Sequence, residues 1–460
     1  MPESSPKGPY LRDIIKSAKV GEVIILKTGT HKGPLFLSNE VTIQGPEDGS
    51  LATIESDKPG PVLTISGKDV HVKNLTLKTH SRAGLVVHLQ KGTGHLIENC
   101  RLRSKGKINV LTTSHAKGIF HNNEFIGGRT IVSIKNFSRP VFIDNEFPNA
   151  SGEVFSVRND SSPILVGNVI RNSQGVGIYI TDNASGQYLK NEIIGPKHIG
   201  VLISNDAVPE LNSNLFSDCL LSCVSIQGPS RPTIIGNTFK KAMSWAVLTK
   251  GTSRPIILDN IITSSAYGLL FKGETSSIVK GNNISSVGGS AIYVTDSARS
   301  IVENNTLRDN NQGILVRRRS TSTLRNNTVE SSIFTGITVK GKAQADVIQN
   351  FISHGLDAGI IINSSGKVGI YENAVSDNMA SGIEYIKSSS VEIQRNVIKR
   401  NKGDGLYITS DYITHISGNI IMENEGCGVK SKANNLNELI FKNKLVGNVL
   451  GNGCKLNTIE

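Results

Sequence analysis

Long apolar runs and aromatic residues are the features that this sequence has least of. Aromatic residues make up 5% of its 460 residues, there is one Trp, and no apolar run approaches the length of a membrane span. The first residues, Met1 to Lys7, lack the hydrophobic region of a secretion signal. These absences predict a soluble, cytoplasmic protein with no membrane partner.

Cysteine is scarce as well. Cys100, Cys219, Cys223, Cys427 and Cys454 are an odd number and do not follow the spacing of a metal site. The pattern Cys219-x-x-x-Cys223 is weak, and we expect these two side chains to fill a column of the core. Unpaired cysteines favour a reducing, cytosolic setting.

Signatures of cofactor chemistry are missing. The ten histidines are dispersed, with no H-x-H or H-x-x-x-H spacing and no conspicuous carboxylate partner. No phosphate loop or dinucleotide fingerprint occurs. The sequence therefore indicates no metal site and no cofactor-binding residue.

The chain does have a repeat, in which an asparagine recurs every 22 to 25 positions. The recurring residues are Asn74, Asn99, Asn123, Asn145, Asn168, Asn191, Asn214, Asn237, Asn260, Asn283, Asn305, Asn327, Asn350, Asn373, Asn396, Asn419 and Asn443. At Asn122/Asn123, Asn282/Asn283, Asn304/Asn305 and Asn326/Asn327 either member of the pair fits the period. A period of this length indicates a solenoid.

The units of the repeat distinguish a parallel β-helix from a leucine-rich repeat. Each contains three short extended runs joined by turns, for example 177–182, 187–191 and 192–194, and no stretch keeps apolar residues at helical spacing. The fold class is therefore all-β, a single-stranded parallel β-helix solenoid of about 17 coils that lie ~4.8 Å apart. The asparagines are expected to form a structural ladder, since Asn tolerates a left-handed turn and its amide can both donate and accept.

An apolar residue two positions after most of these asparagines is expected to point into the core. These residues are Phe125, Phe147, Ile170, Ile193, Phe216, Phe239, Ile262, Leu307, Val329, Ile352, Val375, Ile398, Ile421 and Leu445.

The two ends differ from the repeats. Leu11, Ile14, Ile15 and Ala18 fall on one helical face, which predicts a short helix over 9–19 that caps the N-terminal end of the core. The expected organisation is 1–40 as N-terminal cap and first strand, 41–445 as β-helix repeats, and 446–460 as final coil and tail. The last repeat shows no capping helix in the sequence, so self-association through this end, or end to end, is a further expectation.

Several units carry a family resemblance. They are Gly21-Glu-Val-Ile-Ile-Leu-Lys-Thr-Gly-Thr-His-Lys-Gly33, Val41-Thr-Ile-Gln-Gly45, Val70-His-Val-Lys-Asn-Leu-Thr-Leu77, Gly200-Val-Leu-Ile-Ser-Asn205 and Gly313-Ile-Leu-Val316. Nearly the whole chain resembles the right-handed parallel β-helix family of pectin-lyase-like fold, in the branch of NosD-type copper-maturation proteins and the repeat region of F-box-only proteins. The resemblance implies a right-handed coil and a carbohydrate-binding and sugar-hydrolysis domain. Members of the family include polysaccharide lyases, hydrolases and epimerases, and also non-enzymatic modules that bind carbohydrate or protein.

Departures from these relatives limit what the resemblance implies. The sequence has no recognisable F-box, no Cys/His zinc module and no export leader of the kind that NosD-type proteins are expected to carry. The Asp-Pro-His-Asp signature of alginate epimerases and the Asp-Asp and Gly-His-Gly pairs of polygalacturonases are also missing. The resemblance therefore specifies the fold far better than the activity.

One turn offers candidate catalytic residues. Counted from the ladder, it carries Asn159/Asp160, Asp182/Asn183 and Asn205/Asp206 in three consecutive coils. Asp160, Asp182 and Asp206 would lie ~5 Å apart, and the outer pair ~10 Å, which are separations used by glycosidases. Arg158 beside them could stabilise a developing negative charge, and in a lyase the three carboxylates could hold Ca²⁺. Ordinary turn chemistry is the competing interpretation, because Asp and Asn are common turn residues.

Further along the chain, the same edge carries positively charged side chains in place of carboxylates. The candidate binding residues are Lys250, Lys272, Arg317, Arg318, Arg319, Lys340, Lys342 and Lys387. If the columns hold, these cations line one ridge that could meet an anionic glycan or an acidic protein surface. Alternatively, they are solubilising charges that discourage sideways association of sheets. The ridge lacks interleaved aromatic residues, which argues against nucleic acid.

Three functions remain open from the sequence. The favoured hypothesis is a non-catalytic recognition scaffold that binds a protein or glycan along one long face. The alternatives are a polysaccharide lyase or glycoside hydrolase that uses the Asp cluster, and a structural subunit of a larger assembly.

Overall fold

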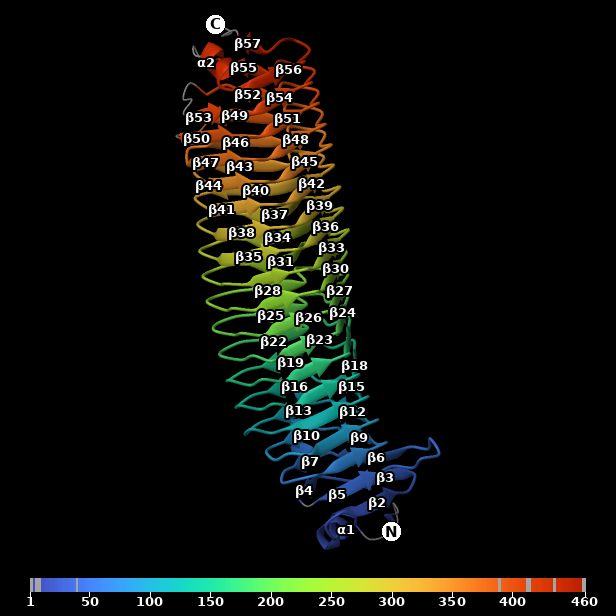
Figure 1. The fold of residues 1–460 in the computed structure, drawn as a ribbon. Helices are drawn as coiled ribbons and strands as arrows, with labels where there is room; N and C mark the ends of the chain where they lie inside the picture. The colour runs from blue at the N-terminus through green and yellow to red at the C-terminus, as the bar shows by residue number, and fades with distance from the viewer. Residues whose placement is uncertain are drawn as a thin grey trace. The chain divides into compact units, whose positions relative to one another are not determined.

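The computed structural model describes residues 3–4, 10–38, 40–387, 390–410, 415–432 and 436–456. The chain is a parallel β-solenoid of about 18 turns, made mostly of strands with two short helices (Figure 1). This confirms the predicted all-β solenoid. The chain divides into two compact units, an N-terminal unit (Met1–Ser225 with Pro229–Thr233) and a C-terminal unit (Ile226–Gly228 with Ile234–Glu460).

A regular turn contributes one strand to each of three parallel sheets, called A, B and C. One turn consists of β14 (Gly118–His121) in sheet A, β15 (Glu124–Gly127) in sheet B and β16 (Thr130–Ile134) in sheet C. Strands of successive turns pair in register, for example Phe120 with Phe142 and Val110 with Val132. Equivalent side chains therefore form columns, as the repeat predicted.

The remaining strands of the N-terminal unit are as follows. Sheet A holds β1 (Glu3–Ser4), β2 (Glu22–Leu26), β5 (Val41–Gln44), β8 (His71–Lys73), β11 (His95–Glu98), β17 (Val141–Ile143), β20 (Ile164–Val166), β23 (Gln187–Leu189) and β26 (Glu210–Asn212). Sheet B holds β3 (Gly29–Lys32), β6 (Ala52–Ser56), β9 (Thr76–Thr79), β12 (Arg101–Ser104), β18 (Glu146–Pro148), β21 (Val169–Arg171), β24 (Glu192–Ile194) and β27 (Leu215–Ser217). Sheet C holds β4 (Leu35–Leu37), β7 (Gly60–Ile65), β10 (Gly84–Leu89), β13 (Ile108–Thr112), β19 (Glu153–Val157), β22 (Ile178–Ile180) and β25 (Val201–Ile203). The chain passes from one unit to the other within β28 (Val224–Ile226) and β29 (Thr233–Ile235).

The strands of the C-terminal unit follow the same order. Sheet A holds β32 (Ile256–Leu258), β35 (Ser276–Lys280), β38 (Arg299–Glu303), β41 (Thr321–Arg325), β44 (Gln344–Ile348), β47 (Lys367–Tyr371), β50 (Ser390–Gln394) and β53 (His415–Ser417). Sheet B holds β30 (Thr238–Lys240), β33 (Ile261–Thr263), β36 (Asn283–Ser285), β39 (Thr306–Arg308), β42 (Thr328–Glu330), β45 (Phe351–Ser353), β48 (Ala374–Ser376), β51 (Val397–Lys399), β54 (Ile420–Met422) and β56 (Lys444–Val446). Sheet C holds β31 (Trp245–Thr249), β34 (Tyr267–Phe271), β37 (Ser290–Val294), β40 (Gln312–Arg318), β43 (Ile337–Gly341), β46 (Ile360–Ser364), β49 (Ile383–Lys387), β52 (Leu406–Ile408), β55 (Val429–Ser431) and β57 (Gly453–Lys455).

The predicted asparagine ladder lies in the turn between sheets A and B. In each step the side-chain Oδ1 of one Asn accepts hydrogen bonds from the backbone N–H and the Nδ2 of the Asn one turn earlier. Asn145 donates to Asn168 Oδ1 in this way at 3.0 and 2.9 Å. The ladder runs through Asn123, Asn145, Asn168, Asn191 and Asn214 in the N-terminal unit, and through Asn237, Asn260, Asn282, Asn305, Asn327, Asn350, Asn373, Asn396, Asn419 and Asn443 in the C-terminal unit. These amides satisfy backbone groups that the turn would otherwise leave unpaired inside the protein.

Two expected ladder members, Asn74 and Asn99, are wrong by one residue, and the structure decides a pair that the sequence left open. Asn74 and Asn99 adopt left-handed backbone, with φ of 54° and 52°, and it is the next residue, Cys100, whose backbone N–H donates to Asn123 Oδ1 at 2.9 Å. In the pair Asn282/Asn283, the ladder member is Asn282, while Asn283 is exposed.

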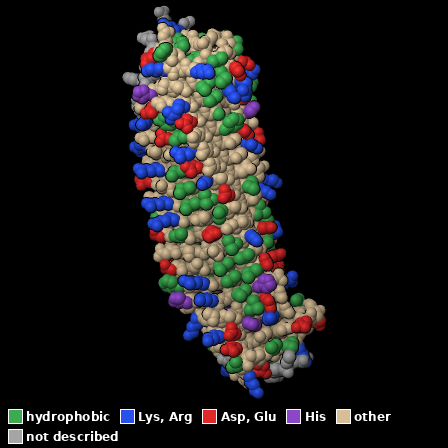
Figure 2. Space-filling model, viewed as in Figure 1, with side chains coloured by type: hydrophobic (Ala, Val, Ile, Leu, Met, Phe, Trp, Pro, Cys, Tyr) green, Lys and Arg blue, Asp and Glu red, His purple; other side chains and the backbone are tan. Residues whose placement is uncertain are grey.

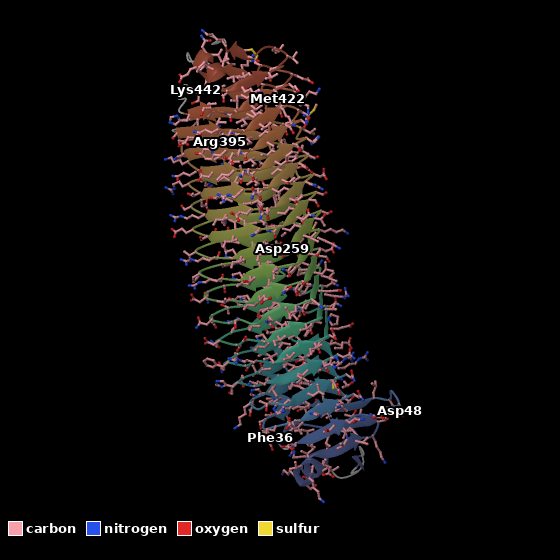
Figure 3. The ribbon with its side chains drawn as sticks, in the orientation of Figure 1. Phe36, Asp48, Asp259, Arg395, Met422 and Lys442 are labelled. Atoms are coloured by element: carbon pink, nitrogen blue, oxygen red, sulfur yellow. A yellow bond between two sulfur atoms is a disulfide. The ribbon has the colours of Figure 1, made fainter. Side chains whose placement is uncertain are left out.

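The reason for this shift is that the turn places its left-handed residue just before the ladder position. Asp259, which is labelled in Figure 3, has a φ of 51° and precedes Asn260. Lys190 and Asn304 do the same before Asn191 and Asn305, with φ of 52° and 54°. The ladder asparagines are therefore selected for their amide and not for tolerance of a left-handed backbone.

The C-terminal unit has a second asparagine ladder, between sheets B and C, that we did not predict. It runs through Asn378, Asn401, Asn424 and Asn448, and Asn310 occupies the equivalent position on an earlier turn, where it accepts the backbone N–H of Val287. Each follows a first-ladder asparagine by five residues, as in Asn396-Val-Ile-Lys-Arg-Asn401. This spacing was the sequence signal for it.

The core consists of stacked apolar columns. The residues predicted two positions after each asparagine are buried, apart from half-buried Leu445. In the N-terminal unit the rings of Phe120 and Phe142 stack with centroids 4.6 Å apart, as do those of Phe125 and Phe147. This repeat distance matches the spacing of paired strands, so like residues pack on like.

Two helices lie near the ends of the chain. The predicted N-terminal helix is confirmed as α1 (Leu11–Ser17), with Leu11 and Ile15 buried. A second helix, α2 (Leu436–Phe441), was not predicted, and it contacts β55 and β57. At this end Asn443, the last ladder residue, donates its Nδ2 to Leu439 O at 2.7 Å and its backbone N–H to Ile440 O at 3.4 Å. Neither α1 nor α2 is long and apolar enough to cross a bilayer, and no other helix occurs in the described ranges.

The cysteines depart from the expectation of unpaired core residues. Cys219 and Cys223 are buried but form a disulfide with Cα atoms 5.4 Å apart, and Cys427 is bonded to Cys454 with Cα atoms 6.1 Å apart. Cys100 is buried and free. The sequence pattern missed these bonds because the folded turns, and not the spacing along the chain, bring the pairs within disulfide distance. The argument for a reducing setting from unpaired cysteines is therefore lost, since disulfides persist in oxidising compartments.

Candidate functional site

The predicted Asp cluster lies in the N-terminal unit, in the turn that leads from sheet C to sheet A. Val157, Ile180 and Ile203 are aligned in sheet C. Three residues further on, Asp160 and Asp206 therefore share a column, two coils apart. Asn183 occupies the position between them.

Asp182 belongs to the neighbouring column, which differs from the expected row of three carboxylates. Its Oδ2 accepts hydrogen bonds from the backbone N–H of Asn159 at 3.2 Å and from Asn159 Nδ2 at 3.1 Å. Its Oδ1 accepts from Asn205 Nδ2 at 3.5 Å. Asp182 thus joins three successive turns, which is the role that turn chemistry gives to Asp and Asn.

Arg158 lies beside this turn but contacts the outer face of sheet C. Its Nε donates to Ser156 Oγ at 3.0 Å, and its guanidinium carbon lies 5.0 Å from the centroid of the Tyr179 ring. This is a cation–π geometry. Within the part of the chain that the structure describes, no group of three or more His, Cys, Asp or Glu side chains could hold a metal ion. The catalytic role of Arg158 and the three aspartates stays a prediction.

The predicted basic ridge lies in the C-terminal unit, where strands of sheet C end. Arg317 pairs with Lys340, Lys340 with Asn363, and Asn363 with Lys387 after a register irregularity. These four residues and Ser365 line a cleft of about 440 Å³, which we call the basic cleft. Figure 2 shows Lys and Arg side chains recurring along the left edge of the view in this unit.

The three cations of the basic cleft carry uncompensated charge. Arg317 and Lys387 are exposed and Lys340 is half-buried. None of the three forms an ion pair within 4.0 Å with a described carboxylate. Because successive turns lie ~4.8 Å apart, Arg317 and Lys387 are separated by ~14 Å along the solenoid. The cleft therefore presents a row of positive charge to solvent.

The other predicted cations are arranged differently. Arg318 Nη1 donates to Asp296 Oδ1 at 2.6 Å, so its charge is compensated. Lys250 and Lys272 follow Thr249 and Phe271, which are paired in sheet C, and so occupy the same column on earlier turns. Arg319 and Lys342 lie beyond the strand ends and do not line the cleft.

Two aromatic side chains on the same sheet were missed by sequence reasoning. Trp245 and Tyr267 are aligned in sheet C, and their rings stack with centroids 4.5 Å apart. Tyr267 is 42% exposed, and a Cβ on Gly289 would lie 2.1 Å from its Cε1, so the ring rests directly against a glycine. The sequence gave no signal, because the two residues are 22 apart and no motif surrounds them.

A half-buried carboxylate on the outer face of sheet C was also missed. Burial raises the pKa of Glu384, and the nearby charges of Asp357 and Asp404 raise it further. Asp404 accepts hydrogen bonds from the backbone N–H of Cys427 at 2.7 Å and lies 4.0 Å from Lys430 Nζ. Glu384 belongs to β49, as Lys387 of the basic cleft does.

We expect Glu384→Gln to stabilise the protein at neutral pH. The folded-state pKa of Glu384 is raised, so the protonated side chain stabilises the folded state. This stabilisation is fully present below the ordinary pKa of glutamate and is lost as pH rises through the folded-state pKa. Removing the ionised group should therefore raise the free energy of unfolding by roughly 0.5 kcal/mol at pH 7, since solvent screens this partly exposed side chain, and by nothing measurable near pH 4. Urea unfolding of both proteins between pH 4 and 8 measures the difference.

Glu392→Gln is the control of opposite sign. A hydrogen bond from Tyr371 at 2.7 Å and the charge of Lys367 lower the pKa of Glu392. Ionised Glu392 therefore stabilises the folded state above the ordinary pKa of glutamate, and this stabilisation is lost as pH falls. Glu392→Gln should be less stable than the wild type at pH 7. If both substitutions changed the free energy of unfolding equally at pH 7, the opposite pKa shifts of Glu384 and Glu392 would be contradicted.

Comparison with known proteins places the fold. A model of the right-handed beta helix region matches residues 62–207 and 199–352, which is more than half of the chain. The chain belongs to the right-handed β-helix family. A model of the periplasmic copper-binding protein NosD matches residues 334–453 of this β-helix. No curated protein matched the sequence.

Solved β-helix structures resemble the chain at low identity. The periplasmic alginate epimerase AlgG is 11% identical with a TM-score of 0.38, over 99% of this chain and 84% of that one. The catalytic unit of the GH87 alpha-1,3-glucanase from Streptomyces thermodiastaticus is 13% identical with a TM-score of 0.38, over 83% and 66%. ORF18 of Geobacillus virus E2 is 13% identical with a TM-score of 0.39, over 55% of this chain and 53% of that one, so this β-helix spans about half of it. At these TM-scores the likenesses carry no information on activity.

Proposed function

We propose that this protein is a non-catalytic recognition scaffold whose C-terminal unit binds a linear anionic polysaccharide in the basic cleft. The observation that carries the proposal is the row formed by Arg317, Lys340 and Lys387 on successive strands of sheet C, with Asn363 between the two lysines and no described carboxylate partner. A row of like charges is costly to keep unless it meets an opposite charge. A chain of sugar acids would bring anions at regular intervals along the same direction.

The chemistry beside the cations favours a glycan over an acidic protein surface. Asn363 and Ser365 line the cleft with groups that can hydrogen-bond to hydroxyls, and such groups fix the orientation of a polar ligand. Trp245 and Tyr267 lie on the same sheet and offer apolar ring surface of the kind that packs against sugar rings. An acidic protein remains the competing partner in the experiment below.

Binding to polygalacturonate tests the proposal, with fully methyl-esterified polygalacturonate as the uncharged control polymer. We expect the full-length protein to bind only the charged polymer, and more weakly as salt is added. Replacing Arg317, Lys340 and Lys387 together by Gln should weaken binding about a hundredfold, if each partly exposed contact contributes about 1 kcal/mol. Calorimetry or biolayer interferometry measures both affinities.

Arg318→Gln is the matched control, because it removes a charge from the same strand that Asp296 already compensates. It should change the affinity by less than about threefold. Equal binding of the two polymers, or equal losses in Arg318→Gln and the triple variant, would contradict the proposal. Release of reducing or unsaturated sugars that is lost in Asp182→Asn or Glu384→Gln would show an enzyme instead. Selective capture of acidic proteins, with no binding to the charged polymer, would show a protein partner.

A further inference from the structure

A cavity in the N-terminal unit is separate from the basic cleft and has a different character. It encloses about 710 Å³ between α1, β4 and β7, which is within the range of small-molecule sites. Leu35 and Val41 form part of its buried floor, at 3% and 2% exposure. Three prolines, Pro34, Pro59 and Pro61, add apolar surface to its walls. The cavity can therefore hold the body of an apolar ligand.

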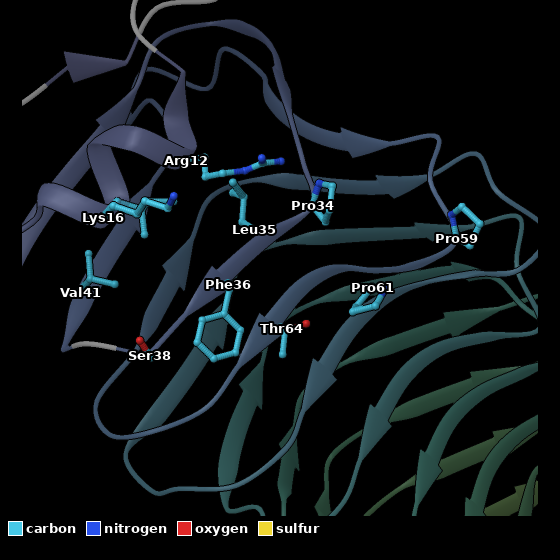
Figure 4. A pocket seen from close by; sticks show the side chains of 11 residues that line it. Arg12, Lys16, Pro34, Leu35, Phe36, Ser38, Val41, Pro59, Pro61 and Thr64 are labelled. Carbon is cyan, nitrogen blue, oxygen red and sulfur yellow. The ribbon is translucent and has the colours of Figure 1, made fainter.

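An aromatic side chain is left uncovered at this cavity. Phe36 is 56% exposed and lies beside Thr64, its partner in sheet C. Figure 4 shows Phe36 and Thr64 on the strand side of the cavity, with Arg12 and Lys16 on the helix side. A flat ring packed against Phe36 would remove its apolar surface from water.

Two cations face the same cavity without a partner. Arg12 and Lys16 both line it and are four residues apart on α1, so they lie on one face of the helix. Like charges at this spacing repel each other. Among the residues that the structure describes, no Asp or Glu lines the cavity, and neither side chain forms a hydrogen bond or ion pair. An anion bound in the cavity would relieve this repulsion.

We propose that this cavity binds a small aryl carboxylate, which is a flat apolar body that carries one negative charge. The ring packs against Phe36 and the prolines, and the carboxylate accepts hydrogen bonds from Arg12 and Lys16. An inorganic anion would leave the apolar wall uncovered, because it has no apolar body. A neutral aromatic compound would cover the wall but leave the charges of Arg12 and Lys16 uncompensated. No bond is made or broken in the process.

Calorimetric titration of the full-length protein with 2-naphthoate tests the proposal, and 2-naphthamide is the matched probe because it has the same rings and no charge. We expect 2-naphthoate to bind at least about tenfold more tightly than 2-naphthamide, as one charge-assisted contact in a partly exposed site would give. In a variant with both Arg12→Gln and Lys16→Gln, that difference should disappear while the affinity for 2-naphthamide is kept. Phe36→Ala should weaken both probes, and because Phe36 is exposed this variant keeps its fold.

Lys19→Gln is the matched control variant. It removes an exposed cation just beyond α1 that does not line the cavity, so the preference for 2-naphthoate should be unchanged. Equal affinities of the wild-type protein for the two probes, an absence of binding, or unchanged binding in Phe36→Ala would overturn the proposal. A loss of preference in Lys19→Gln as large as in the double variant would overturn it too, because the effect would then follow net charge and not the site.

Discussion

Asn282→Ala should lower the free energy of unfolding by roughly 3–5 kcal/mol, because it leaves several buried polar groups without partners. Asn282 Oδ1 accepts the backbone N–H and the Nδ2 of Asn260 at 3.0 and 2.9 Å, and its own Nδ2 donates to Ile257 O, Lys280 O and Asn305 Oδ1. At 1% exposure, water cannot replace these bonds. Urea unfolding followed by circular dichroism measures the change.

The adjacent residue supplies the control. Asn283 has the same side chain, but it is exposed and begins β36 outside the ladder. Asn283→Ala should change the free energy of unfolding by less than about 0.5 kcal/mol, as surface substitutions usually do. If the two variants lost equal stability, the ladder would not be what holds this turn.

Gly382→Ala should be the second most damaging of the substitutions considered, at about 3 kcal/mol. A Cβ at this position would lie 2.4 Å from Ile398 Cγ2, and 2.9 Å from both Asn401 Nδ2 and Gly405 O. The backbone oxygen cannot move without shifting the next turn, and Asn401 belongs to the second ladder. The added methyl therefore disturbs a core residue and a buried amide together. Thermal and urea unfolding measure the loss.

Gly288→Ala is the matched substitution in the same unit. The nearest atom to its Cβ would be Ala266 O at 3.5 Å, an ordinary contact, and the residue is exposed. Its stability should stay within about 0.5 kcal/mol of the wild type, because the methyl also restricts the unfolded chain. If Gly288→Ala lost as much stability as Gly382→Ala, the cost of adding a methyl group would not depend on the space around the glycine.

Columns could be predicted from the sequence because a solenoid converts a linear period into neighbours in space. Asn123, Phe125 and their equivalents lie where counting placed them, since each turn repeats the same path. Counting alone could not choose between Asn282 and Asn283. The deciding fact is which residue takes the left-handed conformation, and Gly281, with a φ of 68°, is that residue.

The candidate site was less predictable, because its chemistry depends on offsets of one residue and on burial. Asp182 fell one column from Asp160, so the expected row of carboxylates became a bridge between turns. Arg318 and Arg317 are adjacent in sequence, yet only Arg318 meets Asp296. The raised pKa of Glu384 follows from partial burial on an outer face, which no periodic pattern reports.

Helix α2 ends the asparagine ladder by accepting hydrogen bonds from its last residue, Asn443. From Asn237 to Asn419, each ladder asparagine donates its Nδ2 to the amide oxygen of the next, so the row of amides has a direction and needs a terminator. At Asn443 two carbonyls of the α2 segment, those of Leu439 and Ile440, take these donors. A further copy of the chain therefore finds no open amide there to continue the row. Lengthening this protein by design would mean inserting whole turns upstream of α2 and keeping the helix as the stop.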